Sequence, residues 1–372
     1  MRVLYVINTL YNGGAEAHLL LLARGVQQHD VTCEVAFLRE SVGGGSIDLR
    51  GAFEAAGVRT HYLGCEKSYD LRSGVRLSRL LAGGRFDILH SHLPRADAAA
   101  AMAKLFNRTQ TWIATLHHPY DNAYSGAPLI PILAPMWRLA DGVIAVSEPV
   151  RQWSIERLGL RPGNVRTVMH GIELTTSEPP APSATRVCIG TIGRYEPRKG
   201  HETLIRAMVP ILQRFPNAQL RIAGHDPWGH GEVLRRLIAE LRLERHVELT
   251  GYMSDKQTFF AAIDVFAFAS RSEGFGIVLI EAMAAGKPAV VTDIAPLNEI
   301  IEPGHSGLVA ASDDPASFAT AILSLFTDRD YLARVGEAGR RRVAAEFSRG
   351  RMVEKTLQFY RDVAAGRVRQ AS

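Results

Sequence analysis

Short apolar runs alternate with helical patterns along the whole chain. The runs expected to be strands span residues 2–8, 33–38, 58–63, 86–91, 111–116, 142–147, 165–169, 187–192, 218–223, 246–250, 265–270, 288–293 and 307–310. Strands that alternate with helices are typical of α/β proteins with parallel sheets. The sequence therefore predicts an α/β fold built from doubly wound, Rossmann-like sheets.

The length and one Pro-rich stretch predict how these strands are divided. A chain of 372 residues exceeds one hydrophobic core, which favours two domains. Residues 173–185 are rich in Pro, Ser and Thr, as linkers are. We expect domains at 1–172 and 186–348, then a helix and tail at 349–372. Since doubly wound sheets bind ligands beyond the carboxyl ends of their strands, we expect both domains to face a central cleft.

Composition predicts a cytoplasmic protein. Hydrophobic residues make up 47% and charged residues 22%, as in ordinary globular proteins, and no apolar stretch is long enough for a membrane span. The chain starts at once with a strand, so no signal peptide is expected. Cys33, Cys65 and Cys188 lack metal-binding or CxxC spacing, which predicts reduced thiols.

The net charge leaves two kinds of partner open. There are 43 basic and 38 acidic residues, which gives +5, but no basic stripe with interleaved aromatic residues predicts nucleic-acid binding. Anionic substrates or peripheral contact with the inner face of a membrane explain the excess equally well. Arg72, Arg76, Arg79 and Arg85 lie near one face of a predicted helix, and a solvated face is the simpler interpretation.

Two glutamates carry the strongest functional signal. Glu273 and Glu281 are eight residues apart, in a run predicted as a strand, a glycine-rich turn and a helix. Glu273 is expected on the loop and Glu281 about two turns into the helix. Gly274 and Gly276 would leave backbone N–H groups bare at the helix N-terminus, which favours an anion. Carboxylates beside an anion site suit a phosphorylated, hydroxyl-rich ligand such as a nucleotide sugar, although the pair alone would also fit a hydrolase.

Two cations follow the first strand of the second domain. Arg194 and Lys199 lie on a Gly- and Pro-containing loop, Gly193 to Gly200. A pyrophosphate leaving group needs such cations, because Arg supplies a planar fork and Lys a point charge. An ordinary surface turn is the alternative, and the Glu273–Glu281 run in the same domain favours the functional interpretation.

A glycine pair and four histidines mark strand ends of the first domain. Gly13 and Gly14 follow its first strand, where a bare backbone and a helix N-terminus favour phosphate or sugar. His90 and His92 alternate on one face of a strand end, and His117-His118 ends another strand. Without acidic or cysteine ligands at a familiar spacing, we expect no metal site. One histidine facing the cleft is expected to bind a substrate hydroxyl, and at least one to be structural.

Several short patterns are discounted. Leu279 replaces the third glycine of a dinucleotide-binding pattern, and neither a P-loop nor a G-x-S-x-G run is present. Asp328-Arg329-Asp330 is literally Asp-x-Asp, but it lies between two late helical segments, so we interpret it as a helix cap.

The residues together resemble family 4 of the retaining glycosyltransferases with the GT-B fold. The resemblance covers nearly the whole chain, and its last third is the most specific part. It is carried by Gly13-Gly14-Ala15-Glu16, Thr115-Leu116-His117, Val146-Ser147, Gly193-Arg194, Lys199-Gly200, the Glu273–Glu281 run, Thr292-Asp293-Ile294 and Asn298-Glu299-Ile300-Ile301. The chain departs from the family pattern at His170, where Asn is usual, and at Ile294-Ala295, where a glycine pair is common.

The resemblance implies a role for each matched residue. Glu281 would bind the ribose hydroxyls, Glu273 and His117 the donated sugar, and Arg194 and Lys199 the departing diphosphate. The glycines and amides expected around the sugar donor are those of Gly13, Gly14, Gly224, Gly274, Phe275 and Gly276. The resemblance further implies a C-terminal helix that crosses back to the N-terminal domain. Such enzymes need no metal or other cofactor, because protein cations replace the metal.

The sequence thus predicts a retaining hexosyltransferase. It would move a hexose from a nucleoside diphosphate sugar to a hydroxyl of a glycan, a lipid-linked glycan or a small molecule. Two alternatives keep the fold: a nucleotide-sugar epimerase, or a glycan phosphorylase, for which the chain is short. A third alternative is a non-catalytic nucleotide-sugar-binding protein, which would have no need of cations placed for a leaving group.

Overall fold

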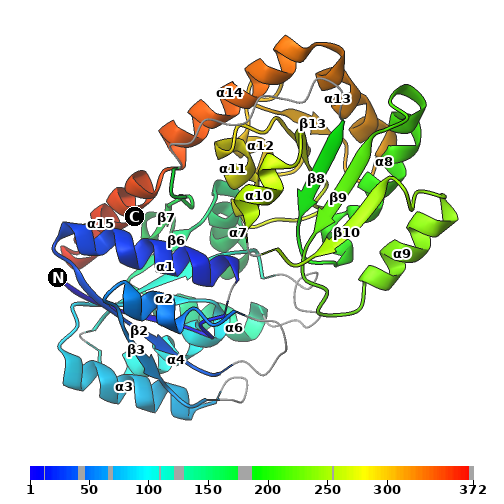
Figure 1. Ribbon diagram of the computed structural model, residues 1–372. Helices are drawn as coiled ribbons and strands as arrows, with labels where there is room; N and C mark the ends of the chain where they lie inside the picture. The colour runs from blue at the N-terminus through cyan, green and yellow to red at the C-terminus, as the bar shows by residue number, and fades with distance from the viewer. Residues whose placement is uncertain are drawn as a thin grey trace. The chain divides into compact units, whose positions relative to one another are not determined.

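The computed structural model divides the chain into two units. One consists of Met1–Glu173 with Arg349–Ser372, and the other of Leu174–Ser348 (Figure 1). The structure describes residues 1–11, 13–40, 47–65, 70–108, 110–120, 130–174, 187–253 and 255–367. Most of the predicted linker, from residue 175 onward, lies outside the described residues.

The first unit contains a parallel sheet in which, among the described residues, seven strands are ordered β3-β2-β1-β4-β5-β6-β7. The strands are β1 (Arg2–Ile7), β2 (Thr32–Phe37), β3 (Arg59–Tyr62), β4 (Ile88–His92), β5 (Thr111–Leu116), β6 (Gly142–Ala145) and β7 (Val165–Thr167). The strand order changes direction between β1 and β4, because β2 and β3 lie on one side of β1 and β4 to β7 lie on the other. Loops that leave the sheet at such a point separate and create a binding site.

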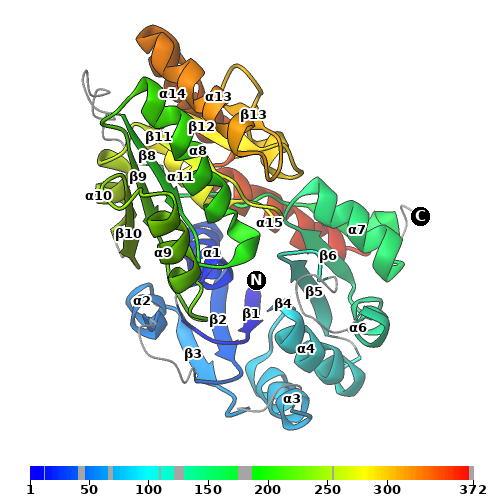
Figure 2. The same ribbon diagram turned by 90° about the vertical axis from the view of Figure 1, so that its right-hand side faces the viewer.

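Helices cover both faces of this sheet. They are α1 (Gly14–Val26), α2 (Arg50–Ala55), α3 (Arg72–Gly84), α4 (Pro94–Phe106), α6 (Ile130–Trp137), α7 (Glu148–Leu158) and α15 (Arg349–Ala364), with the short helices η1 (Gln27–His29) and η2 (Pro162–Asn164). Figure 2 shows α3 beside α4, which packs on β4. The strands are nearly continuous apolar runs because both faces are covered; β1, for example, is buried from Val3 to Ile7.

The C-terminal helix α15 belongs to the first unit, as expected. It packs along α1 (Figure 1), and its residues Met352, Leu357 and Phe359 join the core of this unit. A segment from the far end of the sequence thus completes the N-terminal unit.

The second unit has a parallel sheet in which six strands are ordered β10-β9-β8-β11-β12-β13 among the described residues. The strands are β8 (Cys188–Ile192), β9 (Gln219–Ala223), β10 (Val247–Gly251), β11 (Val265–Phe268), β12 (Ala289–Thr292) and β13 (Leu308–Ala310). Its helices are η3 (Pro197–Lys199), α8 (His201–Arg214), α9 (Gly231–Glu240), α10 (Lys256–Ala261), α11 (Ile277–Ala284), α12 (Leu297–Ile300), α13 (Pro315–Thr327) and α14 (Arg329–Glu346). The direction of strand order reverses between β8 and β11.

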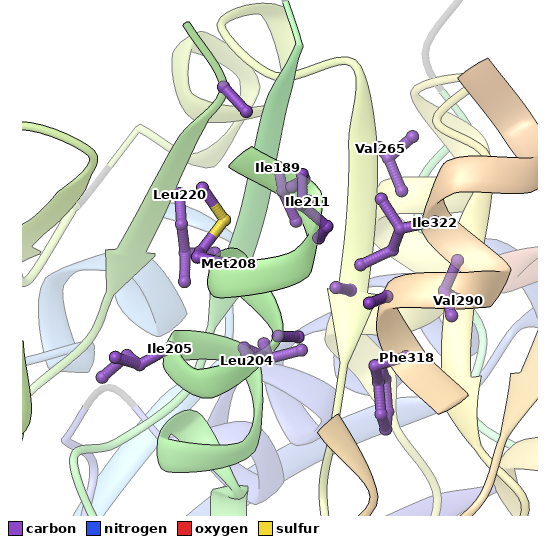
Figure 3. Close-up of a cluster of buried hydrophobic side chains, with 14 of the residues drawn as sticks. Ile189, Leu204, Ile205, Met208, Ile211, Leu220, Val265, Val290, Phe318 and Ile322 are labelled. Carbon is purple, nitrogen blue, oxygen red and sulfur yellow. The ribbon is translucent and has the colours of Figure 1, made fainter. Parts of the chain in front are cut away.

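The core of the second unit lies between the sheet and the adjacent helices α8 and α13 (Figure 3). In that view, Leu204, Met208 and Ile211 of α8 and Phe318 and Ile322 of α13 point toward the strands. The strands contribute β-branched and leucine side chains, namely Ile189, Leu220, Val265 and Val290. The layer fixes β8 and β11 side by side, so that the loops after them begin from a rigid base.

Every predicted strand is present, and the ends differ by two residues or fewer. The Asp328 cap is confirmed: its side chain accepts hydrogen bonds from the backbone N–H groups of Asp330 and Tyr331 at the start of α14. One detail was wrong. Helix α11 begins at Ile277, so Glu281 lies one turn into it, not two. Gly276 has a φ of +119°, a conformation that glycine adopts readily but that lies outside the α-helical region. The helix therefore begins only at the next residue.

Candidate functional site

The loops after β8 and β11 meet at the carboxyl edge of the second sheet. The Nζ atom of Lys199 lies 2.5 Å from Oε1 of Glu273, and the hydroxyl of Ser270 donates to the same oxygen at 2.7 Å. Lys199 and Glu273 are 74 residues apart in sequence. Two of the residues predicted to act on the sugar donor are therefore in direct contact.

Glycines make this close approach feasible. Gly200 has a φ of +63°, and a Cβ atom there would lie 2.0 Å from the carbonyl oxygen of Ala269, directly after β11. Gly224, at the end of β9, is equally constrained, because its Cβ would lie 1.9 Å from the carbonyl oxygen of Gly193. Only glycine lets the backbones at these strand ends pack so closely.

Arg198 joins the two loops and was given no role in the sequence analysis. Its Nη1 atom donates to the carbonyl oxygen of Ser272 at 2.8 Å and lies 4.0 Å from Oε2 of Glu273. Its Nη2 atom donates to Glu196 at 2.8 Å. Its position next to Lys199 in the cation-rich loop was the only signal that could have identified it.

The charges around Glu273 decide its protonation state. Burial favours the neutral acid, but the positive charges of Lys199 and Arg198 and hydrogen bonds from Lys199 and Ser270 outweigh it, so the pKa of Glu273 is lowered. Glu273 is therefore a buried carboxylate, held ionised by its neighbours.

Arg194 is the exposed cation of this cluster. Its guanidinium lies 3.4 Å from Glu196 and above the ring of Trp228, 5.2 Å from the centroid, and 44% of its side chain is exposed. Arg194, Arg198 and Lys199 together with Glu196 and Glu273 give three cations and two carboxylates, a net charge of +1. The arrangement suits an anionic ligand at the exposed end.

Glu281 has a partner that the sequence analysis missed. The Nζ atom of Lys256 donates to both carboxylate oxygens, at 2.7 and 2.8 Å. Lys256 begins α10, which is capped by the side chain of Asp255. No spacing rule connects residues 256 and 281, so this pair could be found only from the structure.

The glycine-rich turn before α11 buries its one large side chain, that of Phe275. The ring of Phe275 is buried against Phe347, at a centroid distance of 5.8 Å. A Cβ atom at Gly276 would lie 2.9 Å from Leu297, which makes the turn tight. Any ligand contact from residues 274–276 would then come from the backbone, as the sequence analysis expected for Phe275 and Gly276.

In the first unit, the glycine pair begins α1. Gly13 precedes the helix and Gly14 is its first residue, while Glu16 folds back so that a Cβ at Gly13 would meet its Oε2 atom at 2.3 Å. Glu16 is held by the Thr9 hydroxyl at 3.3 Å. One turn after Gly14, α1 carries His18, whose ring lies near that of the predicted residue His117.

Five histidines form one cluster around the strand ends of the first unit, and all of them except the half-buried His117 are buried. His90 and His92 lie on one face of β4, as predicted, with ring centroids 4.4 Å apart. His117 follows β5, and two unpredicted members, His18 and His170, lie 5.5 Å from it. The Nδ1 atom of His118, the next residue, contacts the carbonyl oxygen of Pro119.

Three hydrogen-bonded groups hold the cluster. Nδ1 of His92 lies 3.0 Å from Nε2 of His117, and the Nδ1 atoms of His18 and His170 are 2.7 Å apart. His90 bonds to the hydroxyls of Tyr360 at 2.6 Å and Thr115 at 2.7 Å. His90 thus has the structural role expected of at least one histidine, and His170, the departure from the family pattern, pairs with His18.

Burial keeps these rings neutral. It lowers the pKa of His18 and of His90 to about 3, with a further contribution from His18 in the case of His90. The pKa values of His92, His117 and His170 are lowered well below 6.5, mainly by burial and further by neighbouring histidines. Despite this density of imidazoles, no group of three or more His, Cys, Asp or Glu among the described residues could hold a metal ion.

Comparison with known proteins assigns the family. Residues 12–176 match Glycosyltransferase Family 4, and residues 176–342 match Glycosyl transferases group 1. A phosphatidyl-myo-inositol mannosyltransferase of Mycobacterium leprae is 31% identical over 278 residues, which cover 72% of each chain. This chain belongs to glycosyltransferase family 4. The resemblance inferred from the motifs is confirmed.

A second relative matches over a shorter stretch. The Mycobacterium tuberculosis CDC 1551 phosphatidyl-myo-inositol mannosyltransferase is 32% identical over 259 residues, 66% of this chain. That match spans only 65% of the relative's own length.

Solved structures confirm the fold. HepE of Anabaena, determined with UDP and glucose, superposes with a TM-score of 0.83 at 20% identity and covers 96% of this chain and 98% of its own. Sucrose-phosphate synthase of Thermosynechococcus elongatus gives 0.83 at 21% identity, with 98% and 100% covered. The two parallel sheets therefore form the GT-B architecture of this glycosyltransferase family. None of the described helices has the length and apolar character of a membrane span.

Proposed function

We propose that this family 4 protein is a retaining glycosyltransferase that moves a hexose from a nucleoside diphosphate sugar to an acceptor hydroxyl. The observation that carries the proposal is the cation cluster at the carboxyl edge of the second sheet. There Arg198 and Lys199 share Glu273, and Arg194 is exposed beside them. A cluster with a net positive charge stabilises a departing diphosphate.

The reaction has four linked changes. The bond between the anomeric carbon and the diphosphate oxygen breaks, and the acceptor oxygen bonds to that carbon on the same face. The acceptor proton passes to the leaving diphosphate oxygen, so no protein base is required. Arg194 and Lys199 would stabilise the developing negative charge, and Glu273 would contact the sugar while it holds Lys199 in place.

The remaining site residues bind and orient. Glu281 would accept hydrogen bonds from the ribose hydroxyls, which requires that Lys256 share or release its carboxylate. The amides of residues 274–276 and the glycines Gly13, Gly14 and Gly224 would approach the phosphates and the sugar, and His117 would contact the sugar. Protein cations would do the work of a metal, so the proposed reaction is metal-independent.

The relatives suggest which substrates to test first. They include phosphatidyl-myo-inositol mannosyltransferases and a D-inositol 3-phosphate glycosyltransferase of Nocardia farcinica. Another relative is described as a GDP-mannose-dependent mannosyltransferase. We therefore propose a hydroxyl-rich acceptor, either lipid-linked at a membrane surface or free, and GDP-mannose and UDP-glucose as the first sugar donors to examine. Peripheral contact with a cytoplasmic membrane face would follow from a lipid-linked acceptor.

The experiment is a matrix of these sugar donors against phosphatidylinositol vesicles, inositol phosphate and short glycans. We expect one donor to give a glycoside whose anomeric configuration, read by NMR, matches that of the donor, with equal rates in EDTA. An inverted product would contradict retention, and rates lost in EDTA and restored by Mn²⁺ would contradict metal independence. An epimerised nucleotide sugar formed without acceptor would favour the epimerase, and tight binding without turnover or hydrolysis would favour a binding protein.

A further inference from the structure

His92 lies at the centre of the histidine cluster of the first unit. Its Nδ1 atom is 3.0 Å from Nε2 of His117. Its ring is also close to those of His90 and His18, with centroids 4.4 and 5.9 Å away. The side chain is fully buried, and its Nε2 atom has no hydrogen-bond partner among the described residues.

This geometry distinguishes two tautomers of the His92–His117 pair. A neutral imidazole carries one N–H, so one ring must donate and the other accept. If His117 donated through Nε2, His92 would accept at Nδ1 and carry its proton on the buried, unpartnered Nε2. If His92 donates through Nδ1, only a lone pair is buried at Nε2. Buried N–H groups without an acceptor are rarer in folded proteins than unsatisfied acceptors, which favours the second arrangement.

We infer that His92 is a positioning residue that donates its Nδ1–H to Nε2 of His117 and thereby fixes His117 with its own proton on Nδ1. The hydrogen bond made at one ring nitrogen determines which tautomer the other presents. The functional consequence rests on the proposed function, in which His117 contacts the sugar donor.

His117 can donate that proton in a hydrogen bond to a ligand. Its side chain is half-buried, and its Nδ1 atom has no partner among the residues that the structure describes. Its backbone N–H donates to the hydroxyl of Tyr120 at 3.4 Å, and the ring of Tyr120 stacks on Trp137, 5.9 Å between centroids. With both backbone and ring held, His117 presents an N–H group to an oxygen acceptor, either a sugar hydroxyl or a diphosphate oxygen.

The tautomer can be measured directly in full-length protein labelled with ¹⁵N-histidine. We expect the His117 ring, assigned by its loss in His117→Asn, to show the pattern of a proton on Nδ1. In His92→Phe the pattern should change to the other tautomer or to a mixture. His92→Asn places an amide donor near the position of Nδ1 and should restore the original pattern.

Turnover provides the second readout. His92→Phe should lower kcat by roughly tenfold or more, with KM for the sugar donor changed by less than about threefold, and His92→Asn should recover most of the loss. His90→Asn is the matched control, because it removes a buried histidine of the same strand face that is not bonded to His117. It should leave the His117 pattern unchanged even if the protein is less stable.

Three results would overturn the inference: a proton on Nε2 of His117 in the wild type, an unchanged pattern in His92→Phe, or the same change in His90→Asn. Failure of the proposed function would look different. If His117→Asn retained full transferase activity, or if the protein transferred no sugar, the role of His117 in the reaction would fall, while the NMR result would still decide the tautomer.

Discussion

At the scale of single residues, Glu273 shows how opposing effects set a charge. Its burial alone would raise the pKa of the carboxyl, yet Lys199, Arg198 and Ser270 reverse the direction. A buried pair of this kind is costly to break on one side, because the remaining charge is left uncompensated. Substitution of Lys199 alone would therefore affect folding as well as turnover, whereas the exposed Arg194 is a cleaner probe.

Glu281→Ala should weaken the binding of a free nucleoside diphosphate. Loss of hydrogen bonds to a charged group typically costs about 1.5–3 kcal/mol, which corresponds to roughly tenfold to a hundredfold in Kd. Isothermal titration calorimetry measures this directly. Glu337→Ala is the matched control, because Glu337 lies in the same unit and, among the described residues, pairs only with arginines of its own helix α14. An unchanged Kd for Glu281→Ala would refute its assignment to the ribose.

The sequence pointed to most residues of the candidate site, whose roles stay predictions, but not to their partners. Lys199 and Glu273 were both predicted, because each follows a strand end with a recognisable loop. Lys256, His18 and His170 were not, since their contacts depend on where α10, α1 and the segment after β7 lie in space. Local sequence patterns contain no such information.

At the scale of elements, glycines at the strand ends let the backbones of neighbouring loops pack closely. Gly200 turns the loop after β8 against the end of β11, where no side chain fits. The ends of all the strands could be predicted because runs of buried apolar residues stop where the backbone leaves the sheet. The start of α11 was less predictable, since it depends on the positive φ of Gly276.

Gly200→Ala should destabilise the second unit more than its backbone conformation alone explains. A positive φ costs an alanine about 1–2 kcal/mol, and the contact with the carbonyl oxygen of Ala269 adds about 1–3 kcal/mol. Gly304→Ala is the control, because Gly304 also has a positive φ, of +78°, but a Cβ atom there meets nothing within 4 Å. Urea unfolding of both variants should separate the two costs. Equal losses would show that the close contact at Gly200 is unimportant.

At the scale of the whole molecule, the two units differ in the histidines whose pKa is lowered. The first contains His18, His90, His92, His117 and His170, all with a lowered pKa. In the second, burial lowers the pKa of His201 to about 4. Asp97 of the first unit has the opposite behaviour, because burial raises its pKa to about 7 despite hydrogen bonds from Ser91 and Trp137.

The first unit should therefore unfold at a higher pH than the second. A histidine whose folded pKa lies below its unfolded value of about 6.5 stabilises the fold above that pH. Below that pH, each such histidine lowers the free energy of unfolding by up to about 1.4 kcal/mol per pH unit. Asp97 offsets about one histidine, since its protonated form is favoured in the folded state as the pH falls below about 7. Hydrogen exchange followed by mass spectrometry at pH 7.5, 6 and 5 should show protection lost first in β4, β5 and α1. Equal protection of these elements at pH 5 and 7.5 would contradict this account.

If the cations after β8 stabilise a departing diphosphate, their removal should lower turnover, which can be measured in Arg194→Ala and in the double variant Arg194→Ala, Lys199→Ala. Arg235→Ala is the control, because this exposed arginine on α9 pairs with Glu232 alone within the part of the chain that the structure describes. Thermal unfolding monitors the fold of each variant. We expect kcat to fall by roughly 10²-fold or more in the double variant, with a substantial part of that loss in Arg194→Ala alone and none in the control. Normal turnover in a folded double variant would contradict this role of the cations.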